Sequence, residues 1–238
     1  MKIKTLVISL FFCGHAIASN NPIHSQLCYR GKCPTTSEER NIVLDHNVYI
    51  LDMNCRTKFA DWVAYVVDRN NINHEEHRRH WRKDDKLPHD CSIEPKDYDY
   101  AYLNYEYEHG HMAPLSSFGG TAYWSDTNYL SNIVPQKSDL NEGPWSRLEN
   151  HVRDLAKSYQ FVYVITGPVY SETMDGLPNK KDAIVPSAFF KVIIKPNTDN
   201  KIEAYIMPQN AKKHDEYSDY RATVPEIEKA TGLNLLGA

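Results

Sequence analysis

Five short runs rich in β-branched and aromatic residues recur along the chain. They cover residues 47–51, 59–67, 161–165, 188–194 and 202–207. Glycine, proline and asparagine punctuate the sequence between such runs, as at Gly167-Pro168 and Pro196-Asn197. Runs of this length and composition are typical of β-strands, so we expect five strands at these positions.

A period of three to four residues replaces this pattern between residues 144 and 159. The apolar positions that carry the period are Trp145, Leu148, Val152, Leu155 and Ala156. They predict an amphipathic helix, with Pro144 in its first turn. A shorter helix is expected over 224–231, ending at Gly232. Strands and helices mixed without a βαβ rhythm favour an α+β fold, with a central, mainly antiparallel sheet flanked by helices.

The helix expected at 144–159 also carries a polar pair, Glu149 and Arg153. Residues four apart on a helix share a face. A weak, solvated salt bridge is the usual interpretation of such a pair. A role in a catalytic site is the alternative, and the helix alone does not decide between them.

The first eighteen residues have the pattern of a signal peptide. Lys2 and Lys4 charge its start, an apolar run covers 6–13, and Ala16-Ile17-Ala18 is a small-residue cleavage site. The run is too short to span a bilayer, and no second run is long enough. We therefore expect cleavage after Ala18 and one secreted or periplasmic domain over 19–238, because no linker or repeat divides it.

Five cysteines are present, and Cys13 falls within the expected signal peptide. The other four are Cys28, Cys33, Cys55 and Cys91. An exported chain with four cysteines favours two disulfides, with three pairings open. Pairing Cys28 with Cys33 and Cys55 with Cys91 is the simplest, and the second bond would enclose Arg79. A zinc site of four thiolates is the competing hypothesis, although no C-x2-C pair is present.

The charge balance limits how the protein can bind polyanions. The chain has 27 lysines and arginines against 31 aspartates and glutamates, a formal net charge of −4. Proteins that hold nucleic acid by bulk charge need many cations. Any action on nucleic acid must therefore rest on a local basic site together with a metal ion.

The most distinctive stretch is Glu108-His109-Gly110-His111. In an extended segment, side chains two apart point the same way, so both imidazoles could hold one metal. One histidine could instead act as a general base, with Glu108 or a backbone carbonyl fixing its ring. A surface pair without a role is the third interpretation.

A second histidine-rich stretch, "HEEHRRHW", covers 74–81. His74 and His77 are three apart, whereas the helix of a zinc protease needs a spacing of four, so we expect both to be solvated. Arg78 and Arg79 are better candidates for a site, because guanidinium groups suit phosphate oxygens.

Longer segments around these motifs resemble the DNA/RNA non-specific endonucleases of the ββα-metal superfamily, specifically their branch of secreted bacterial nucleases. The segments are "EHGHMAPLSSFGG" and "NYLSNIVPQKSDLNEGPWSRLENHVRDLA", with "GKCPT", "TKFADWVAYVV", "VITGPVY", "VPSAFFKVI" and "VPEIEKATGLNLLGA" in order around them. The resemblance covers most of the mature chain. It implies a ββα-metal nuclease fold and hydrolysis of DNA and RNA to 5′-phosphorylated oligonucleotides.

The resemblance also implies roles at the centre of the reaction. His111 matches the histidine of the family's D-R-G-H motif and would be the general base that takes a proton from water. Asn141 would be the direct protein ligand of Mg²⁺, with waters in the remaining positions and Mn²⁺ as an alternative metal. Glu149 would hold the metal's water shell.

Three further residues complete the implied site. Arg153 would face the phosphate or the adjacent carboxylate, and Arg79 would stabilise negative charge on the phosphate. Asn132 would belong to the same wall and position His111 or the metal's waters. Contacts to backbone phosphates carry no sequence information, which would explain cleavage without base specificity.

The chain departs from the family at D-R-G-H, which here reads Glu108-His109-Gly110-His111. Glu108 keeps a carboxylate, but His109 replaces a permanent cation with a ring largely neutral at pH 7. Two outcomes are open: phosphate binding is weaker, or it strengthens in mild acid until His111 is protonated. Gly110 is expected to serve backbone geometry, because glycine enters left-handed conformations readily.

Three functions remain as hypotheses at this point. The leading one is the magnesium-dependent endonuclease, acting on DNA and RNA as sequence-independent partners, with no membrane partner and with a homodimer left open. The second is a nucleic-acid-binding protein of the same fold in which the altered motif has weakened catalysis. The third is a zinc phosphohydrolase that uses His109 and His111 as metal ligands.

Overall fold

The computed structural model describes residues 26–36, 41–72, 77–199 and 201–237. The expected signal peptide at 1–18 lies outside the described residues. Seven strands form one antiparallel sheet in the order β1-β2-β3-β6-β7-β8-β9. Their bounds are β1 Ile42–Asp45, β2 Tyr49–Asn54, β3 Phe59–Asp68, β6 Phe161–Val169, β7 Ala188–Ile194, β8 Ile202–Pro208 and β9 Arg221–Ala222. The expected α+β fold with an antiparallel sheet is confirmed.

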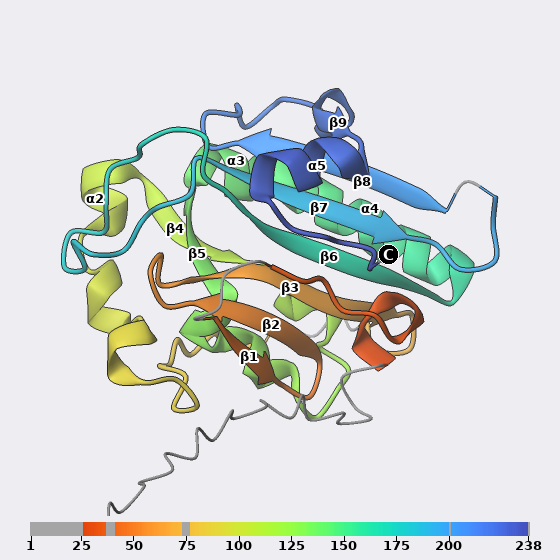
Figure 1. Cartoon of the computed structure of the whole chain (residues 1–238), viewed down its shortest axis with the longest axis horizontal. Coiled ribbons are helices and arrows are strands. Elements are labelled where there is room, and N and C mark those ends of the chain that lie inside the picture. Colours follow the sequence, from red (N-terminus) through yellow and green to blue (C-terminus); the bar gives the residue numbers. More distant parts are fainter. Residues whose placement is uncertain (1–25, 37–40, 73–76, 200, 238) are drawn as a thin grey trace, which may run out of the picture.

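Helices cover both faces of this sheet (Figure 1). The α-helices are α2 Ala101–Tyr105, α3 Ser138–Leu140, α4 Ser146–Tyr159 and α5 Val224–Thr231. A π-helical turn, Asn141–Trp145, leads into α4. Seven short 3-10 helices lie elsewhere in the described chain: Tyr29–Gly31, His89–Cys91, Pro95–Tyr98, Leu115–Ser117, Trp124–Asn128, Leu130–Asn132 and Tyr217–Tyr220. No helix among the described residues is both long enough and apolar enough to cross a membrane.

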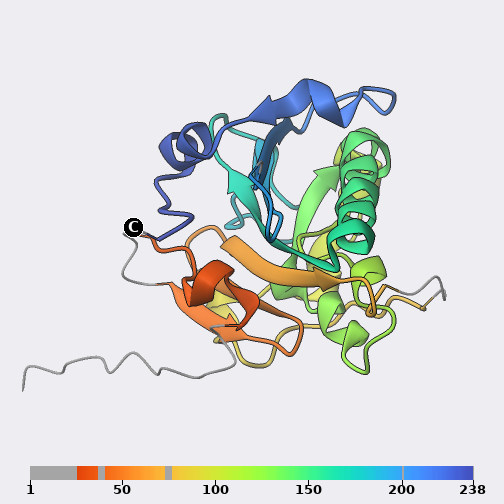
Figure 2. The same ribbon diagram turned by 90° about the vertical axis from the view of Figure 1, so that its right-hand side faces the viewer.

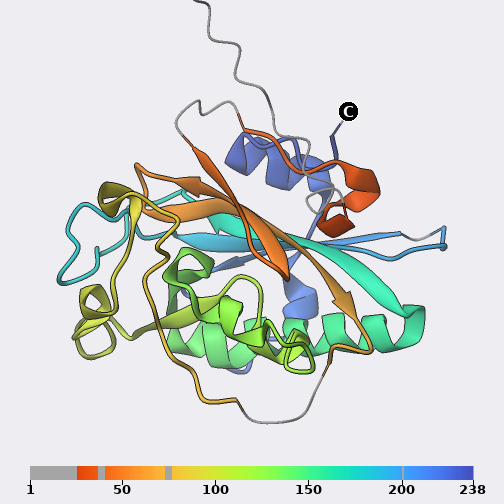
Figure 3. The same ribbon diagram turned by 90° about the horizontal axis from the view of Figure 1, so that it is seen from below.

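One hydrophobic core lies against each face of the sheet. Helix α4 buries Leu148, Val152 and Ala156 on one face, whereas α5 buries Ile227 on the other. Figures 2 and 3 show the two helices on opposite sides of the strands, with the segment that carries β4 and β5 on the α4 side. A site on the α4 side of the sheet therefore packs against the larger of the two cores.

The two expected helices are present. The apolar period of 144–159 becomes the buried stripe of α4, although the α-helix proper begins at Ser146 because Gly143 has a non-helical backbone. Helix α5 begins at a reciprocal capping box between Thr223 and Glu226, and it ends at Gly232 in the left-handed conformation.

All five expected strands are present, with moved ends. The strand expected at 47–51 begins and ends later, as β2, and the strand expected at 161–165 extends to Val169. Four strands were not expected. They are β1, β9 and the two strands of a separate hairpin, β4 Tyr107–His111 and β5 Ile133–Lys137.

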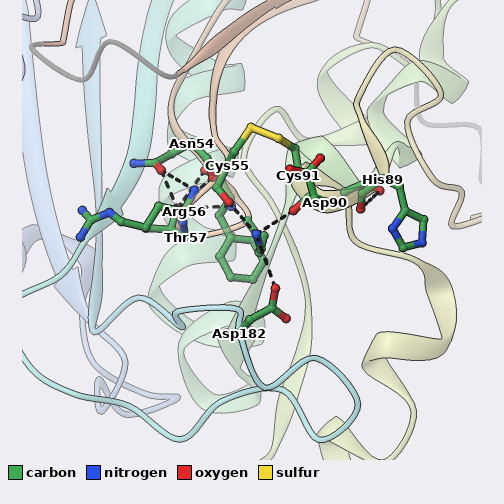
Figure 4. Close-up of a disulfide and its surroundings, with 11 residues drawn as sticks. Asn54, Cys55, Arg56, Thr57, His89, Asp90, Cys91 and Asp182 are labelled. Atoms are coloured by element: carbon green, nitrogen blue, oxygen red, sulfur yellow. Dashed lines mark hydrogen bonds and ion pairs between the residues drawn. A yellow bond between two sulfur atoms is a disulfide. The ribbon is translucent and has the colours of Figure 1, made fainter.

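Both expected disulfides are present, Cys28–Cys33 and Cys55–Cys91. Cys55 follows β2, and Cys91 ends a 3-10 helix (Figure 4). Lys58 braces the same junction, because its ammonium group donates to the backbone oxygens of Cys55 and Asp90, each at 2.7 Å. The bond therefore holds both ends of the segment that contains Arg79.

Candidate active site

The β4–β5 hairpin places the two histidines of the H-x-H pair on one face. Strand β4 pairs His109 with Pro135 and His111 with Ile133. Alternate strand positions face the same side, and both imidazole rings contact Trp81, with ring centroids 4.5 Å away for His109 and 5.3 Å for His111. The shared direction predicted for the pair is confirmed.

A cavity of about 580 Å³ opens beside this hairpin. Five of the seven predicted catalytic and metal-binding residues line it, whereas Asn132 and Arg153 do not. The complete lining is Arg79, Trp81, Tyr98, Tyr102, Tyr107, Glu108, His109, His111, Asn141, Glu142, Ser146 and Glu149. The hairpin, the turn before α4 and the loop containing Arg79 therefore meet at one place.

His111 is almost enclosed, with 9% of its surface exposed. Its Nε2 atom is buried and has no hydrogen-bond partner among the described residues. Burial, the charge of Arg79 and the proximity of His109 lower the pKa of His111 to about 3, and the side chain of Asn128 acts in the opposite direction. The ring is therefore neutral at pH 7, which is the state that a general base requires.

His109 is held between two aromatic rings. It stacks on Tyr98 at a centroid distance of 4.0 Å and on Trp81 at 4.5 Å, nearly parallel to the indole. Burial and the charge of Arg79 lower the pKa of His109 to about 4. The ring thus stays neutral through mild acid, so the expected strengthening of phosphate binding in that range is not supported.

Position 110 requires glycine for a different reason from the expected one. It lies in regular strand pairing with Val134, and it is not among the residues with positive φ. A Cβ atom at this position would lie 2.1 Å from the Oε1 atom of Gln136, which is fully buried. The expectation of a left-handed backbone is wrong, because the close approach of a side chain excludes larger residues here.

Asn141 and Glu108 form the polar side of the cavity. The Nδ2 group of Asn141 donates to the Oε2 atom of Glu108 across 2.7 Å. Burial raises the pKa of Glu108, and this hydrogen bond opposes the rise. With the amide nitrogen committed to Glu108, the amide oxygen of Asn141 is the atom left to accept or coordinate. Amide and carboxylate oxygens are the hard donors that Mg²⁺ prefers.

The described residues do not form a metal site with several protein ligands. Among the described residues, no three His, Cys, Asp or Glu side chains are grouped so that they could hold a metal ion. Zinc sites use three or four such side chains. The donor set therefore suits a hydrated Mg²⁺ with one amide ligand better than it suits zinc.

Glu149 and Arg153 do not pair with one another in the described structure. The Nη1 group of Arg153 donates to Ser116 at 2.7 Å, and its Nη2 group donates to Asn150. Arg153 thereby ties α4 to the loop after β4. Burial raises the pKa of Glu149, although the charges of Lys191, Arg153 and Arg79 oppose the rise.

Arg79 is exposed and lines the cavity. The segment leading to it is anchored by His77, which stacks on Trp124 at 4.2 Å and hydrogen-bonds through Nε2 to the oxygen of Gly119 at 2.7 Å. The expectation that His77 is solvated is wrong, because this ring is partly buried in an aromatic contact. His74 lies outside the described residues.

Asn132 is fully buried behind the cavity. Its Oδ1 atom accepts from the backbone nitrogen of Ala113, and its Nδ2 group donates to the oxygens of Ala113 and Thr127, each at 2.9 Å. Its backbone oxygen accepts from Met112 at 3.0 Å. Asn132 therefore contacts the two residues that directly follow His111.

Several cavity residues were not assigned from the sequence. The link between Glu108 and Asn141 joins residues far apart in the chain, and no local pattern indicates it. Tyr98 and Tyr102 also line the cavity. Of these residues, only Glu108 could have been found from the sequence, because it is the first residue of the E-H-G-H motif.

Known proteins match this architecture and sequence. Residues 29–237 match the model of the DNA/RNA non-specific endonuclease family. A nuclease of Serratia marcescens is 40% identical over 206 residues, covering 84% of this chain and 77% of that protein. Human mitochondrial endonuclease G is 33% identical over 211 residues, covering 78% and 66%.

A solved structure agrees with these sequence matches. The chain superimposes on a crystal structure of an EndoG/EndoGI complex with a TM-score of 0.72 and 26% identity, covering 82% of this chain and 85% of the other. The chain therefore belongs to the DNA/RNA non-specific endonuclease family.

Proposed function

We propose that this protein is a secreted or periplasmic endonuclease that uses Mg²⁺ to hydrolyse phosphodiester bonds of DNA and RNA. The observation that carries the proposal is the cavity that His111 shares with Asn141, Glu149 and Arg79. It joins a buried neutral imidazole, hard oxygen donors and an exposed guanidinium group. Family membership supports nucleic acid as the substrate.

The proposed chemistry follows from these side chains. His111 accepts a proton from the water that attacks phosphorus, and the bond between phosphorus and the 3′ oxygen breaks. The departing 3′ oxygen takes a proton from water, and His111 returns its proton to the solvent, so the products are a 3′ hydroxyl and a 5′-phosphorylated end. Arg79 stabilises the negative charge that grows on the phosphate.

Two residues act on the metal position. Asn141 would hold the metal through its amide oxygen, with Glu108 orienting the amide group, and Glu149 would hold the metal's water shell. When bound, Mg²⁺ would stabilise charge on the phosphate and on the departing oxygen. Arg153 and Asn132 lie outside the cavity lining, and we assign to them the positioning of the loop after β4.

Export is the second part of the proposal. The pattern of residues 1–18 is that of a signal peptide, and the two disulfides suit an oxidising compartment. Intact-mass analysis of protein collected from the periplasm or medium should begin at Ser19. Retention of residues 1–18 would contradict the cleavage site.

The direct test uses supercoiled plasmid and total RNA with Mg²⁺ or EDTA, alongside a His111→Ala control. We expect loss of both substrates only with metal and only with His111 intact. A failure to cleave from mildly acid to mildly alkaline pH, with nucleic acid still bound in a retention assay, would favour the catalytically weakened binding protein. Stoichiometric zinc in active protein would favour the phosphohydrolase.

A further inference from the structure

Lys191 is a charged residue at the centre of the apolar strand β7. It is 0% exposed, and it pairs in register with Thr166 of β6 and Tyr205 of β8. Burying an ammonium group is unfavourable unless the surroundings compensate it. A lysine kept inside "AFFKVII" therefore needs a reason beyond packing.

The contacts of Lys191 are aromatic and hydroxyl groups. Its Nζ atom lies 3.3 Å from the hydroxyl oxygen of Tyr65 and 4.3 Å from the ring centroid of Trp145. No carboxylate within the described part of the chain lies within ion-pair distance of it. This arrangement differs from that of Lys195, whose ammonium group pairs directly with Glu203 at 2.9 Å.

The same contacts connect Lys191 to residues that neighbour Glu149 and His111. Trp145 lies four residues before Glu149 in a continuous helical segment, so the two side chains share a face. On the other side, the hydroxyl group of Tyr65 donates to the backbone oxygen of Met112 at 3.3 Å. Met112 directly follows His111.

The charged groups around Lys191 are Glu149 and Arg153, both on α4. Burial lowers the pKa of Lys191 to about 8, Glu149 opposes this effect, and Arg153 adds to it. In turn, Lys191 is the first of three cations that act on the Glu149 carboxylate, ahead of Arg153 and Arg79. Charges interact more strongly across the protein interior than across water.

We propose that Lys191 is a positioning residue of the nuclease site, whose buried ammonium group stabilises the Glu149 carboxylate and, through Tyr65, the backbone beside His111. The inference rests on the proposed function. In this proposal, β7 supplies a positive charge through Lys191. That charge keeps Glu149 ionised, so that Glu149 can hold water around the metal. The group touches no substrate and acts only through its neighbours.

The test compares Lys191→Met with wild type in plasmid cleavage at saturating Mg²⁺ and in thermal unfolding. Loss of a partner that tunes a metal site typically lowers activity about 10–100-fold. We expect a decrease of that size in kcat with little change in KM. We also expect a lower melting temperature, because the Glu149 carboxylate then lacks the first of the cations that compensate its charge.

A double-mutant cycle separates this role from a structural one. In a Glu149→Gln background, Lys191→Met should cause little further loss of activity, because the charge on which it acts is already absent. The full decrease repeated in that background would overturn the proposal. Full activity of Lys191→Met in the wild-type background would do the same.

Controls keep these outcomes distinct. Lys195→Met is the matched variant, since it removes a buried lysine nearby and should lower the melting temperature without lowering kcat. Lys191→Gln replaces Lys191→Met if the latter does not fold.

The rise in melting temperature caused by Mg²⁺ should be smaller in the Lys191 variant, and an unchanged rise would count against the proposal. An inactive wild type would contradict the proposed function, whereas active wild type with fully active Lys191→Met contradicts only this inference.

Discussion

The side-chain amide of Asn141 donates to Glu108 across 2.7 Å, although 33 positions separate the two residues in the sequence. Asn141 lies in the turn before α4, and Glu108 lies in β4. This hydrogen bond leaves the amide oxygen of Asn141 as the atom available to the proposed Mg²⁺. The carboxylate therefore acts on the proposed ligand without being assigned as a ligand itself.

Glu108→Ala should weaken the response to Mg²⁺. Without the carboxylate the amide can rotate, so we expect the Mg²⁺ concentration for half-maximal cleavage to rise about 10–100-fold. Much of the activity should return at high Mg²⁺. A Mg²⁺ titration of plasmid cleavage measures this, with Glu108→Asp as the control that keeps the charge. An unchanged Mg²⁺ dependence would show that Asn141 needs no orientation.

His109→Arg should raise activity at pH 7. An arginine can stack between Trp81 and Tyr98 as the imidazole does, and it adds a permanent charge beside the cavity. We expect a lower KM for plasmid and a steeper decrease of activity with salt. His109→Gln, which adds no charge, is the control. Equal KM values for His109→Arg and wild type at neutral pH would exclude the idea.

Asn132→Ala should lower stability and activity together. The substitution removes three hydrogen bonds and leaves buried backbone groups unpaired, which lowers the free energy of unfolding by about 2–3 kcal/mol. Because the freed loop follows His111, kcat should also fall at temperatures where the variant is folded. Urea unfolding and cleavage at 20 °C or so measure the two effects. A stable, fully active variant would contradict the positioning role.

Glu203→Gln should remove an acid-sensitive contribution to stability. The hydrogen bond with His151, supported by Lys195 and Tyr205, lowers the pKa of Glu203 to about 2. A carboxylate with a lowered folded-state pKa stabilises the protein above its unfolded pKa, near 4.5, and this stabilisation is lost as pH falls toward 2. Melting temperatures of wild type and variant should therefore differ at pH 7 and converge in that range. A constant difference down to pH 2 would contradict this assignment.

Replacing Cys55 and Cys91 together by serine should destabilise the chain. The disulfide spans a sequence separation of 36 residues, for which loop-closure entropy gives a stabilisation of about 4 kcal/mol. The enclosed segment carries Arg79, so cleavage should also decrease below the melting temperature. Non-reducing peptide mapping of wild type should recover the Cys55–Cys91 peptide pair. Free thiols at these positions would remove the basis of the prediction.

Local patterns predict the parts of this fold that local physics governs. The apolar stripe of α4, the glycine stop of α5 and the long strands β3 and β7 match expectation, because apolar periodicity, a helix-ending glycine and a β-branched and aromatic composition can each be recognised within a single segment. The β4–β5 hairpin is different. Its strands are joined by a long connection and contain glycine and proline, so neither run has the composition of a strand.

The identities of the catalytic candidates were readable in the sequence, because imidazole, amide, carboxylate and guanidinium groups in this order resemble one family of nucleases. Their neighbours were not. Glu108 meets Asn141, His109 enters a stack between Trp81 and Tyr98, and Lys191 lies beneath the α4 face that carries Glu149, only after distant segments pack together. A pKa depends on burial and on nearby charge. The sequence by itself therefore determined the family and the chemical groups, whereas only the tertiary structure decided their protonation, their orientation and the residues that support them.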